Sequence, residues 1–477
     1  MRPGRISAAV VLVLVGVVAP PAPALAGGRV LVVDDDLVQC PRAAFTGVQA
    51  ALDAARIGDT VRVCGGTYAG AVMLDKSVSL VAQVPAAPGV DCLGGGPVPD
   101  GSAMIVGAVT MSGPGARLDG LVVTGAPTGV TTSADAAGYQ LRRAVVQGNE
   151  DFGIDLRSSG GQATVVERNC IRGNAGDGTL GEHAGIVADS ADLIDAAIRN
   201  NTFTGNLEAI SIVGLRSYSK ISIRQNTVRG EAIAIAGSTE SEILRNDLDN
   251  TRSGRDGIVF GGGNVGLVVG GNTIVGALPG MKFCSLCTND HNVAPNAGLL
   301  ITGNMIRNGA GSGITMAGSD STAPVQLTRS VIERNTITGA PASGIFLNDT
   351  AVGNTVVGNT SSGNARGINV AGATGNVLLR NTLTGNTIVD ARDTTPDQNT
   401  WIGNRCATDD PVGRLCATGR SAGAAAPTAI PPAPAVDRSR WPCLRVPVWD
   451  IDPVDGGAWM MVSVVAPDAP AGTFCGA

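Results

Sequence analysis

Ten asparagines recur along the middle and C-terminal parts of the chain at intervals of 20 to 32 residues. An apolar residue stands three positions before each of them, and in eight of the ten units another apolar residue follows two positions after. The asparagines are at positions 169, 201, 226, 246, 272, 304, 335, 359, 381 and 404. Ten units in one register predict a fold in which a single structural unit is stacked along the molecule.

A second marker, a glycine followed by isoleucine, keeps a constant phase with the asparagines. It stands at residues 153, 185, 257, 313, 344 and 367, with variants at Ala209-Ile210, Ala232-Ile233 and Gly280-Met281. Short β-type runs such as 257–260 fill each unit, and no helical period fits units this short and rich in Gly, Asn and Thr. Each unit is therefore predicted to be one coil of a parallel β-helix. A leucine-rich-repeat horseshoe is the alternative, but its Leu-rich pattern and helical segment are absent.

The asparagines are expected at the bends between strands, because asparagine tolerates the left-handed conformation. Stacked asparagine side chains can also hydrogen-bond along the column. Glycine, with 67 of 477 residues, fits a chain that needs many tight turns.

Residues 48–68, followed by residues 74–80, resemble the opening cap of the pectin-lyase-like, right-handed parallel β-helix superfamily. In that superfamily a short helix covers the core, and Gly-Asp-Thr-Val, here residues 58–61, leads into the first strand. Val48, Ala51, Leu52 and Ala55 have the helical spacing expected of such a cap.

The resemblance covers roughly residues 30–405. It implies an all-β, right-handed solenoid with an N-terminal helical cap. It does not imply one activity, because the superfamily includes lyases, hydrolases, epimerases, a metal-centre maturation protein and non-enzymes.

Four segments are predicted. Residues 1–26 have the basic start, apolar stretch and small-x-small ending of a secretory signal peptide; a membrane anchor is the alternative, but the apolar run is short for a span. Residues 27–405 form the β-helix, 406–440 a disulfide loop and an Ala/Pro-rich linker, and 441–477 a small disulfide-closed segment. We expect a secreted, extracellular monomer, cleaved near Ala26, without a further membrane span. The net charge of −6 and the presence of only three lysines argue against a nucleic-acid partner, which needs a basic face.

All ten cysteines follow the predicted signal peptide, which favours disulfides. Local spacing favours the pairs Cys284–Cys287, Cys406–Cys416 and Cys443–Cys475; Cys40–Cys64 is plausible, and Cys92 and Cys170 are left without convincing partners. Zinc at Cys284-x-x-Cys287 with His291 is the alternative, but a structural zinc site needs four ligands and no second pair stands nearby.

Two consecutive coils are lengthened after the marker, near residues 284–297 and 317–327, which predicts two long loops side by side. The first loop carries Asp290 and His291, and the second carries Asp320. Lys282 should point outward, because Met281 and Phe283 take the inward positions. A lysine, carboxylates and a histidine could act as general acid and base on a uronic sugar. A solvated loop pinned by a disulfide is the alternative.

Three acids, Glu208, Glu231 and Asp256, stand just before the marker in successive coils and should form a column. Like charges that close repel unless a cation intervenes, so the column predicts a Ca²⁺ site. Hydrated carboxylates at a turn are the alternative.

These observations lead to two hypotheses about the function of the protein. The first is an exported β-helix that acts on or binds polysaccharide, with lyase or epimerase chemistry if it is catalytic. The second is a non-enzymatic secreted or cell-surface solenoid that binds a glycan or a protein. Scarce aromatic residues and the missing Asp-Pro-His-Asp motif of alginate epimerases favour the second, whereas adjacent loops with charged tips favour the first. Nine scattered methionines and two histidines argue against metal delivery.

Overall fold

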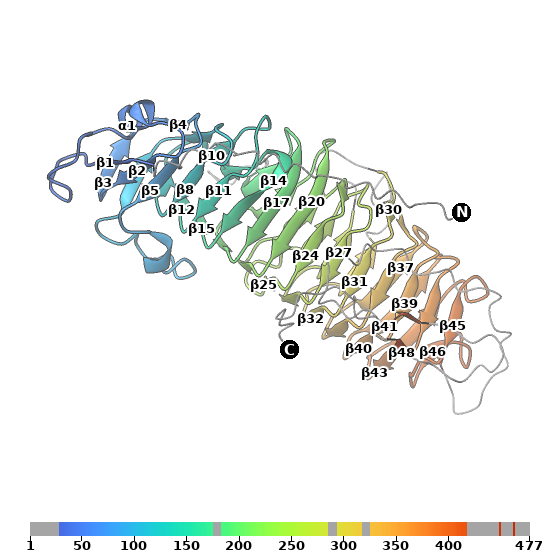
Figure 1. The fold of residues 1–477 in the computed structure, drawn as a ribbon. Helices are drawn as coiled ribbons and strands as arrows, with labels where there is room; N and C mark the ends of the chain where they lie inside the picture. The colour runs from blue at the N-terminus through green and yellow to red at the C-terminus, as the bar shows by residue number, and fades with distance from the viewer. Residues whose placement is uncertain are drawn as a thin grey trace, which may run out of the picture.

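The computed structural model describes residues 28–174, 183–284, 293–316 and 325–416, together with two short strands at 448–449 and 461–462. Within the solenoid, each coil contributes one strand to each of three parallel sheets in succession. The stacked coils form an elongated rod (Figure 1). The chain is therefore the all-β, right-handed parallel β-helix that the repeat and the resemblance predicted.

The three sheets are named A, B and C in the order in which each coil visits them. Sheet A comprises β1 (Val30–Val33), β2 (Thr60–Val63), β5 (Ser79–Ala82), β8 (Arg117–Asp119), β11 (Gln140–Arg142), β14 (Ser158–Glu167), β17 (Leu193–Arg199), β20 (Tyr218–Arg224), β24 (Glu242–Leu244), β27 (Val268–Gly270), β31 (Leu300–Thr302), β35 (Val331–Glu333), β39 (Thr355–Val357), β42 (Val377–Leu379) and β45 (Thr400–Ile402), with β23 (Ser238–Thr239) beside β20. Sheet B comprises β3 (Gly66–Ala69), β6 (Ala103–Val106), β9 (Val122–Thr124), β12 (Val145–Gln147), β15 (Cys170–Arg172), β18 (Thr202–Thr204), β21 (Thr227–Arg229), β25 (Asp247–Asp249), β28 (Thr273–Val275), β32 (Met305–Arg307), β36 (Thr336–Thr338), β40 (Thr360–Ser362) and β43 (Thr382–Thr384). Sheet C comprises β4 (Val72–Leu74), β7 (Val109–Met111), β10 (Thr128–Thr132), β13 (Phe152–Asp155), β16 (Ala184–Ala188), β19 (Glu208–Ile212), β22 (Ile233–Ile235), β26 (Ile258–Phe260), β29 (Met281–Phe283), β33 (Ile314–Met316), β37 (Ser343–Asn348), β41 (Arg366–Ala371), β44 (Val389–Asp393) and β46 (Asp409–Asp410).

A small parallel sheet of β30 (Asn296–Ala297), β34 (Leu327–Thr328) and β38 (Ala351–Val352) lies outside these three, and β47 (Val448–Trp449) pairs antiparallel with β48 (Met461–Val462). The helices are α1 (Val48–Ala54) and the short 3-10 helix η1 (Ala87–Gly89). Among the described residues, no helix is long and apolar enough to cross a bilayer.

The ten repeating asparagines form one continuous ladder at the corner between sheets A and B. The amide oxygen Oδ1 of Asn226 accepts hydrogen bonds from the backbone N and the Nδ2 of Asn201, at 3.0 and 3.1 Å, and this pattern continues through to Asn404. Asn201 Nδ2 also donates to the carbonyl of Val166. Because all ten side chains are buried, the ladder satisfies polar groups that would otherwise be costly inside the rod. The predicted asparagine stacking is confirmed.

The left-handed conformation at this corner does not belong to the asparagines, contrary to our expectation. In each of the ten units it belongs to the preceding residue, for example Arg168 with φ 57°, Gln225 with φ 55° and Gly303 with φ 62°. The asparagine itself keeps an ordinary backbone conformation and supplies the hydrogen bonds. At this corner one residue therefore adopts the left-handed turn conformation, and the asparagine that follows it makes the hydrogen bonds.

The marker glycines are required by close approach between coils, and not by a left-handed turn. A Cβ at Gly257 would lie 2.3 Å from the carbonyl oxygen of Gly280, and one at Gly313 would lie 2.6 Å from that of Gly344. Neither glycine has a positive φ. The isoleucine that follows each marker glycine, such as Ile258 or Ile314, is fully buried in the core. In each Gly-Ile marker, the glycine therefore lies at a close backbone contact between coils and the isoleucine lies in the core.

Helix α1 lies at the N-terminal end of the rod (Figure 1) and packs against β1, β2 and β4. Its residues Val48, Ala51 and Leu52 are buried in the main core, as their helical spacing predicted. Among the described residues, three disulfides are formed, Cys40–Cys64, Cys92–Cys170 and Cys406–Cys416.

Two of these disulfides agree with the predicted pairs. The third joins the two cysteines for which spacing offered no partner, since they are 78 residues apart. Cys92 lies on a loop whose apolar residues pack on the outer face of sheet B, and β15 begins there with Cys170. Cys284 is disulfide-bonded, so its sulfur is not a free thiolate for zinc. Cys287, Cys443 and Cys475 lie outside the described residues.

Candidate functional site

One outward-facing row of side chains runs along the outer face of sheet C, and we call it the outer row. Its members follow the buried apolar residue of the marker in successive coils and are paired by the strand register. From the N-terminal side they are Asp155, Val187, Ser211, Ala234, Val259, Lys282, Thr315, Phe346, Asn369 and Arg392. Neighbouring members are about 4.8 Å apart along the rod. The row places acidic Asp155 toward one end and cationic Lys282 and Arg392 in the other half.

Lys282 lies on β29 with its side chain outward, because Met281 and Phe283 on either side are buried. The register pairs Lys282 with Thr315 on β33. β29 and β33 are the strands that precede the two lengthened segments, so the bases of the predicted loops are neighbours in sheet C. Asp290, His291 and Asp320 themselves lie outside the described residues.

The ammonium of Lys282 forms an ion pair with Asp256, with Nζ 3.5 Å from Oδ2. Both side chains are about one quarter exposed, so the pair lies partly shielded at the surface of the rod. Burial raises the pKa of Asp256, and the attraction of Lys282 opposes that rise. Burial also raises the pKa of Glu208, opposed by a hydrogen bond from Ser211 in the outer row. Carboxyl groups with raised pKa beside a cation are the kind of cluster that acid–base chemistry uses.

Glu231 has a different role from its two neighbours in the predicted column. A second asparagine ladder, Asn149, Asn174 and Asn206, runs at the corner between sheets B and C. Glu231 occupies the next position of this ladder. Its Oε1 accepts hydrogen bonds from the backbone N of Asn206, at 2.7 Å, and from Nδ2 of the same residue, at 3.2 Å. The side chain is 1% exposed, and burial raises its pKa to about 8.

The predicted calcium column is therefore aligned in register, but its carboxylates do not gather. Glu231 turns into the ladder, whereas Asp256 turns toward Lys282. In the described part of the chain, the one group of three acids close enough to share a cation is Asp34, Asp35 and Asp36. Backbone N–H groups already donate to all three of these carboxylates.

Sequence reasoning missed the C-terminal half of the outer row, including Phe346, Asn369 and Arg392. Phe346 is half-buried on β37, and the amide oxygen of Asn369 on β41 is buried without a hydrogen-bond partner among the described residues. The signal was present in the sequence, because every outer-row residue follows the apolar member of the marker.

Comparison with solved structures finds 54 matching chains, and those named below share low sequence identity with this chain. No curated protein matches significantly. The Dettilon tailspike protein (gp208) shares 16% identity at a TM-score of 0.37, over 75% of this chain, which spans 64% of the tailspike. A mannuronic acid-specific polysaccharide family 6 lyase from human gut microbiota shares 14% identity at a TM-score of 0.40, over 74% of this chain and 87% of the lyase. The A-module of a mannuronan C-5 epimerase from Azotobacter vinelandii shares 15% identity at a TM-score of 0.31, over 76% and 94%.

A family model described as "Periplasmic copper-binding protein (NosD)" matches residues 101–279 and 282–410. Copper prefers imidazole, thiolate and thioether ligands. The residues that the structure describes do not fit such a site: their cysteines are in disulfides, and His183 is the one histidine. The exposed methionines Met73 and Met305 belong to different sheets, far apart along the chain. The family match itself spans well over half of the residues, so the chain belongs to the NosD family.

Proposed function

We propose that this protein binds an acidic polysaccharide, with the sugar chain lying along the outer row of sheet C. The observation that carries the proposal is the C-terminal half of that row. There Lys282, Thr315, Phe346 and Arg392 offer two cations, a hydroxyl and an aromatic ring, with the buried Asn369 between Phe346 and Arg392 in the register. A straight row of this kind suits an extended ligand better than a compact one.

Charge supports an anionic glycan in this half of the row. The chain has a net charge of −6, which opposes the approach of a polyanion in general. Lys282 and Arg392 are the cations of this half of the row; each forms an ion pair with one acid, Asp256 and Asp410 respectively, and keeps further N–H groups that can donate to a glycan carboxylate. Phe346 offers an apolar surface between them for a pyranose ring.

A catalytic role at the same place is the second candidate, and the environment of Lys282 favours it. Lys282 would act with Asp290, His291 and Asp320 in withdrawing the proton next to the carboxyl group of a uronic sugar, as in lyase or epimerase chemistry. The carboxyl groups of Asp256 and Glu208, with pKa values raised chiefly by burial, would hold or return a proton nearby. The disulfides support an exported protein, secreted or periplasmic, that meets such a glycan outside the cytoplasm.

The test is a binding and turnover panel with pectate and alginate as polyuronates, hyaluronan as a copolymer that contains glucuronate, and dextran as the neutral control, each with and without calcium. Binding is measured by calorimetry, and turnover by new unsaturated or reducing ends. We expect polyuronate binding that Lys282→Met weakens about tenfold and that falls as salt rises. Lys220→Met, which removes an exposed lysine from sheet A, is the matched control. Failure of every polyuronate to bind, or equal binding by Lys282→Met and wild type, would contradict the proposal.

A further inference from the structure

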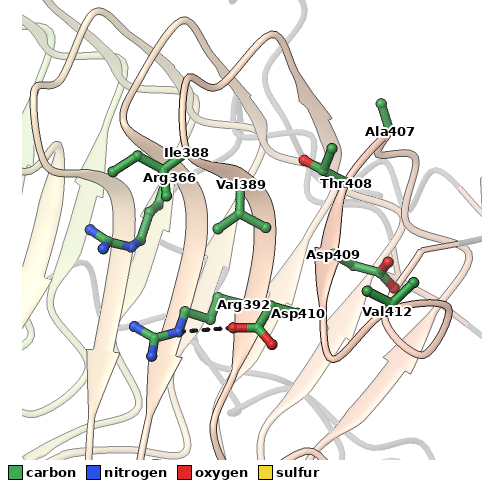
Figure 2. A pocket seen from close by; sticks show the side chains of 9 residues that line it. All are labelled: Arg366, Ile388, Val389, Arg392, Ala407, Thr408, Asp409, Asp410 and Val412. Atoms are coloured by element: carbon green, nitrogen blue, oxygen red, sulfur yellow. Dashed lines mark ion pairs between the residues drawn. The ribbon is translucent and has the colours of Figure 1, made fainter.

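A cavity of about 550 Å³ lies at the C-terminal end of sheet C, between β41, β44 and the turn that carries β46. Figure 2 shows the guanidinium groups of Arg366 and Arg392 on the same side of this cavity, with Thr408 and Val412 across from them. Its volume is within the usual range for a small-molecule site. Arg392 of the outer row lines this cavity, and the register pairs it with Asp410 on β46.

The far wall of the cavity is held in place by two carboxylates. Asp390, 2% exposed, accepts hydrogen bonds from the backbone N–H groups of Ala407 and Thr408. Asp409 accepts four more, from the backbone N–H groups of residues 413–416. Burial opposes ionisation of Asp409, but these four donors hold its pKa below the ordinary value.

The Cys406–Cys416 disulfide closes the same loop. The cavity is consequently built before any ligand arrives, which lowers the entropic cost of binding.

The charges that line the cavity leave one guanidinium without a counter-ion. Arg392 is paired with Asp410, with Nε 3.3 Å from Oδ2, and Asp409 is engaged by backbone donors. Arg366 has no ion-pair or side-chain hydrogen-bond partner in the described part of the chain, and its Nε is buried from solvent. The formal charges of the lining, two arginines and two aspartates, sum to zero, but Arg366 forms no ion pair with either aspartate. The guanidinium of Arg366 can therefore donate to a carboxylate, which matches the two-pronged donor geometry of arginine.

The remaining lining suits a sugar ring. Ile388 and Val412 are 60% and 88% exposed and present apolar surface at the rim. The hydroxyl of Thr408 accepts a hydrogen bond from the backbone N–H of Asp390 at 2.9 Å, which leaves its own proton to donate to a ligand.

We infer that this cavity binds a single hexuronic acid residue, with its carboxylate on Arg366 and a ring hydroxyl on Thr408. The identity of the ligand as an acidic sugar rests on the proposed function, since the cavity continues the outer row. The carboxylate could belong to a free uronic acid or to the end of a glycan chain, and both present the same chemistry to Arg366.

The test measures binding of free galacturonate and glucuronate, a galacturonate trimer, and neutral galactose and glucose to the full chain by calorimetry. Wild type should bind the uronates and not the neutral sugars. Arg366→Gln should weaken uronate binding roughly 10- to 100-fold, as expected for a lost charge-assisted hydrogen bond. Arg405→Gln, an exposed arginine on the last coil that does not line the cavity, is the matched control. Tighter binding of the trimer would identify a chain end as the ligand, and equal binding would identify the free acid.

Lys282→Met separates this inference from the proposed function, because Lys282 lies on β29, well before the cavity. We expect Lys282→Met to weaken polyuronate binding and to leave monosaccharide uronate binding unchanged. Absence of uronate binding, equal binding of galactose, or unchanged affinity in Arg366→Gln would each overturn the inference. Loss of monosaccharide binding in Lys282→Met would also overturn it, since the ligand would then sit on the outer row.

Discussion

Replacing Glu231 by glutamine should stabilise the protein at alkaline pH and leave its stability nearly unchanged at acidic pH. The Glu231 carboxyl is 1% exposed at the end of the second asparagine ladder, and burial raises its pKa from 4.5 to about 8. Below pH 4.5 the group carries a proton in both the native and the unfolded chain. Between pH 4.5 and 8 the native state keeps the proton while the unfolded chain loses it, so stability falls as pH rises through this window.

The size of the effect follows from the two pKa values. At about 1.4 kcal/mol per pH unit, a rise from 4.5 to about 8 corresponds to at most roughly 5 kcal/mol of stability lost by pH 9. A glutamine cannot ionise, and its Oε1 can accept the same two hydrogen bonds from Asn206. The variant should therefore escape this loss.

Urea unfolding followed by circular dichroism, at intervals from pH 4.5 to 9, measures the difference between wild type and Glu231→Gln. That difference isolates Glu231 from Glu208 and Asp256, whose raised pKa values affect both proteins alike. Glu150→Gln, which changes an exposed glutamate, is the control and should follow wild type at every pH. A Glu231→Gln curve parallel to that of wild type would refute the reasoning, because it would mean that the buried carboxyl does not hold its proton.

Three further changes test the packing of the rod, each by chemical denaturation. Asn246→Ala should cost about 3 kcal/mol, because it leaves the buried N–H and Nδ2 of the preceding ladder asparagine unpaired; a cost below about 1 kcal/mol would show that the ladder is dispensable. Gly313→Ala should cost about 1–3 kcal/mol through its clash with the next coil, whereas Gly303→Asn, at a left-handed position with open space, should be tolerated; equal costs would contradict the close-approach argument. Joint replacement of Cys92 and Cys170 by alanine should cost about 2–4 kcal/mol while the circular dichroism spectrum stays that of a β-rod; an unchanged denaturation midpoint would mean that the cross-link contributes little.

The fold could be predicted because the same pattern of asparagine and apolar residues recurs in many units of the chain. The ladder positions, from Asn169 to Asn404, needed only their spacing and their apolar neighbours. The outward orientation of Lys282 followed from alternation along a strand, and the structure agrees. The ladder positions and the outward orientation both depend on local periodicity, which can be read from a short stretch of sequence.

The site was predicted less completely, since it depends on which coils meet and how side chains turn. Register aligns Glu208, Glu231 and Asp256, yet Glu231 turns into the ladder and Asp256 turns toward Lys282. Pairwise distances between side chains of different coils depend on rotamers and hydrogen-bond partners, which spacing along the chain does not encode.

The sequence by itself determined the class of fold, the phase of every coil and the side chains that face inward, because these depend on local alternation repeated at constant spacing. Tertiary structure alone decided three other features: the bond between Cys92 and Cys170, the contact that requires a glycine at each marker, and the cavity around Arg366. Each of these arises where atoms distant in sequence come within a few ångströms of one another. Such proximity results from stacking the coils, and no single coil specifies it.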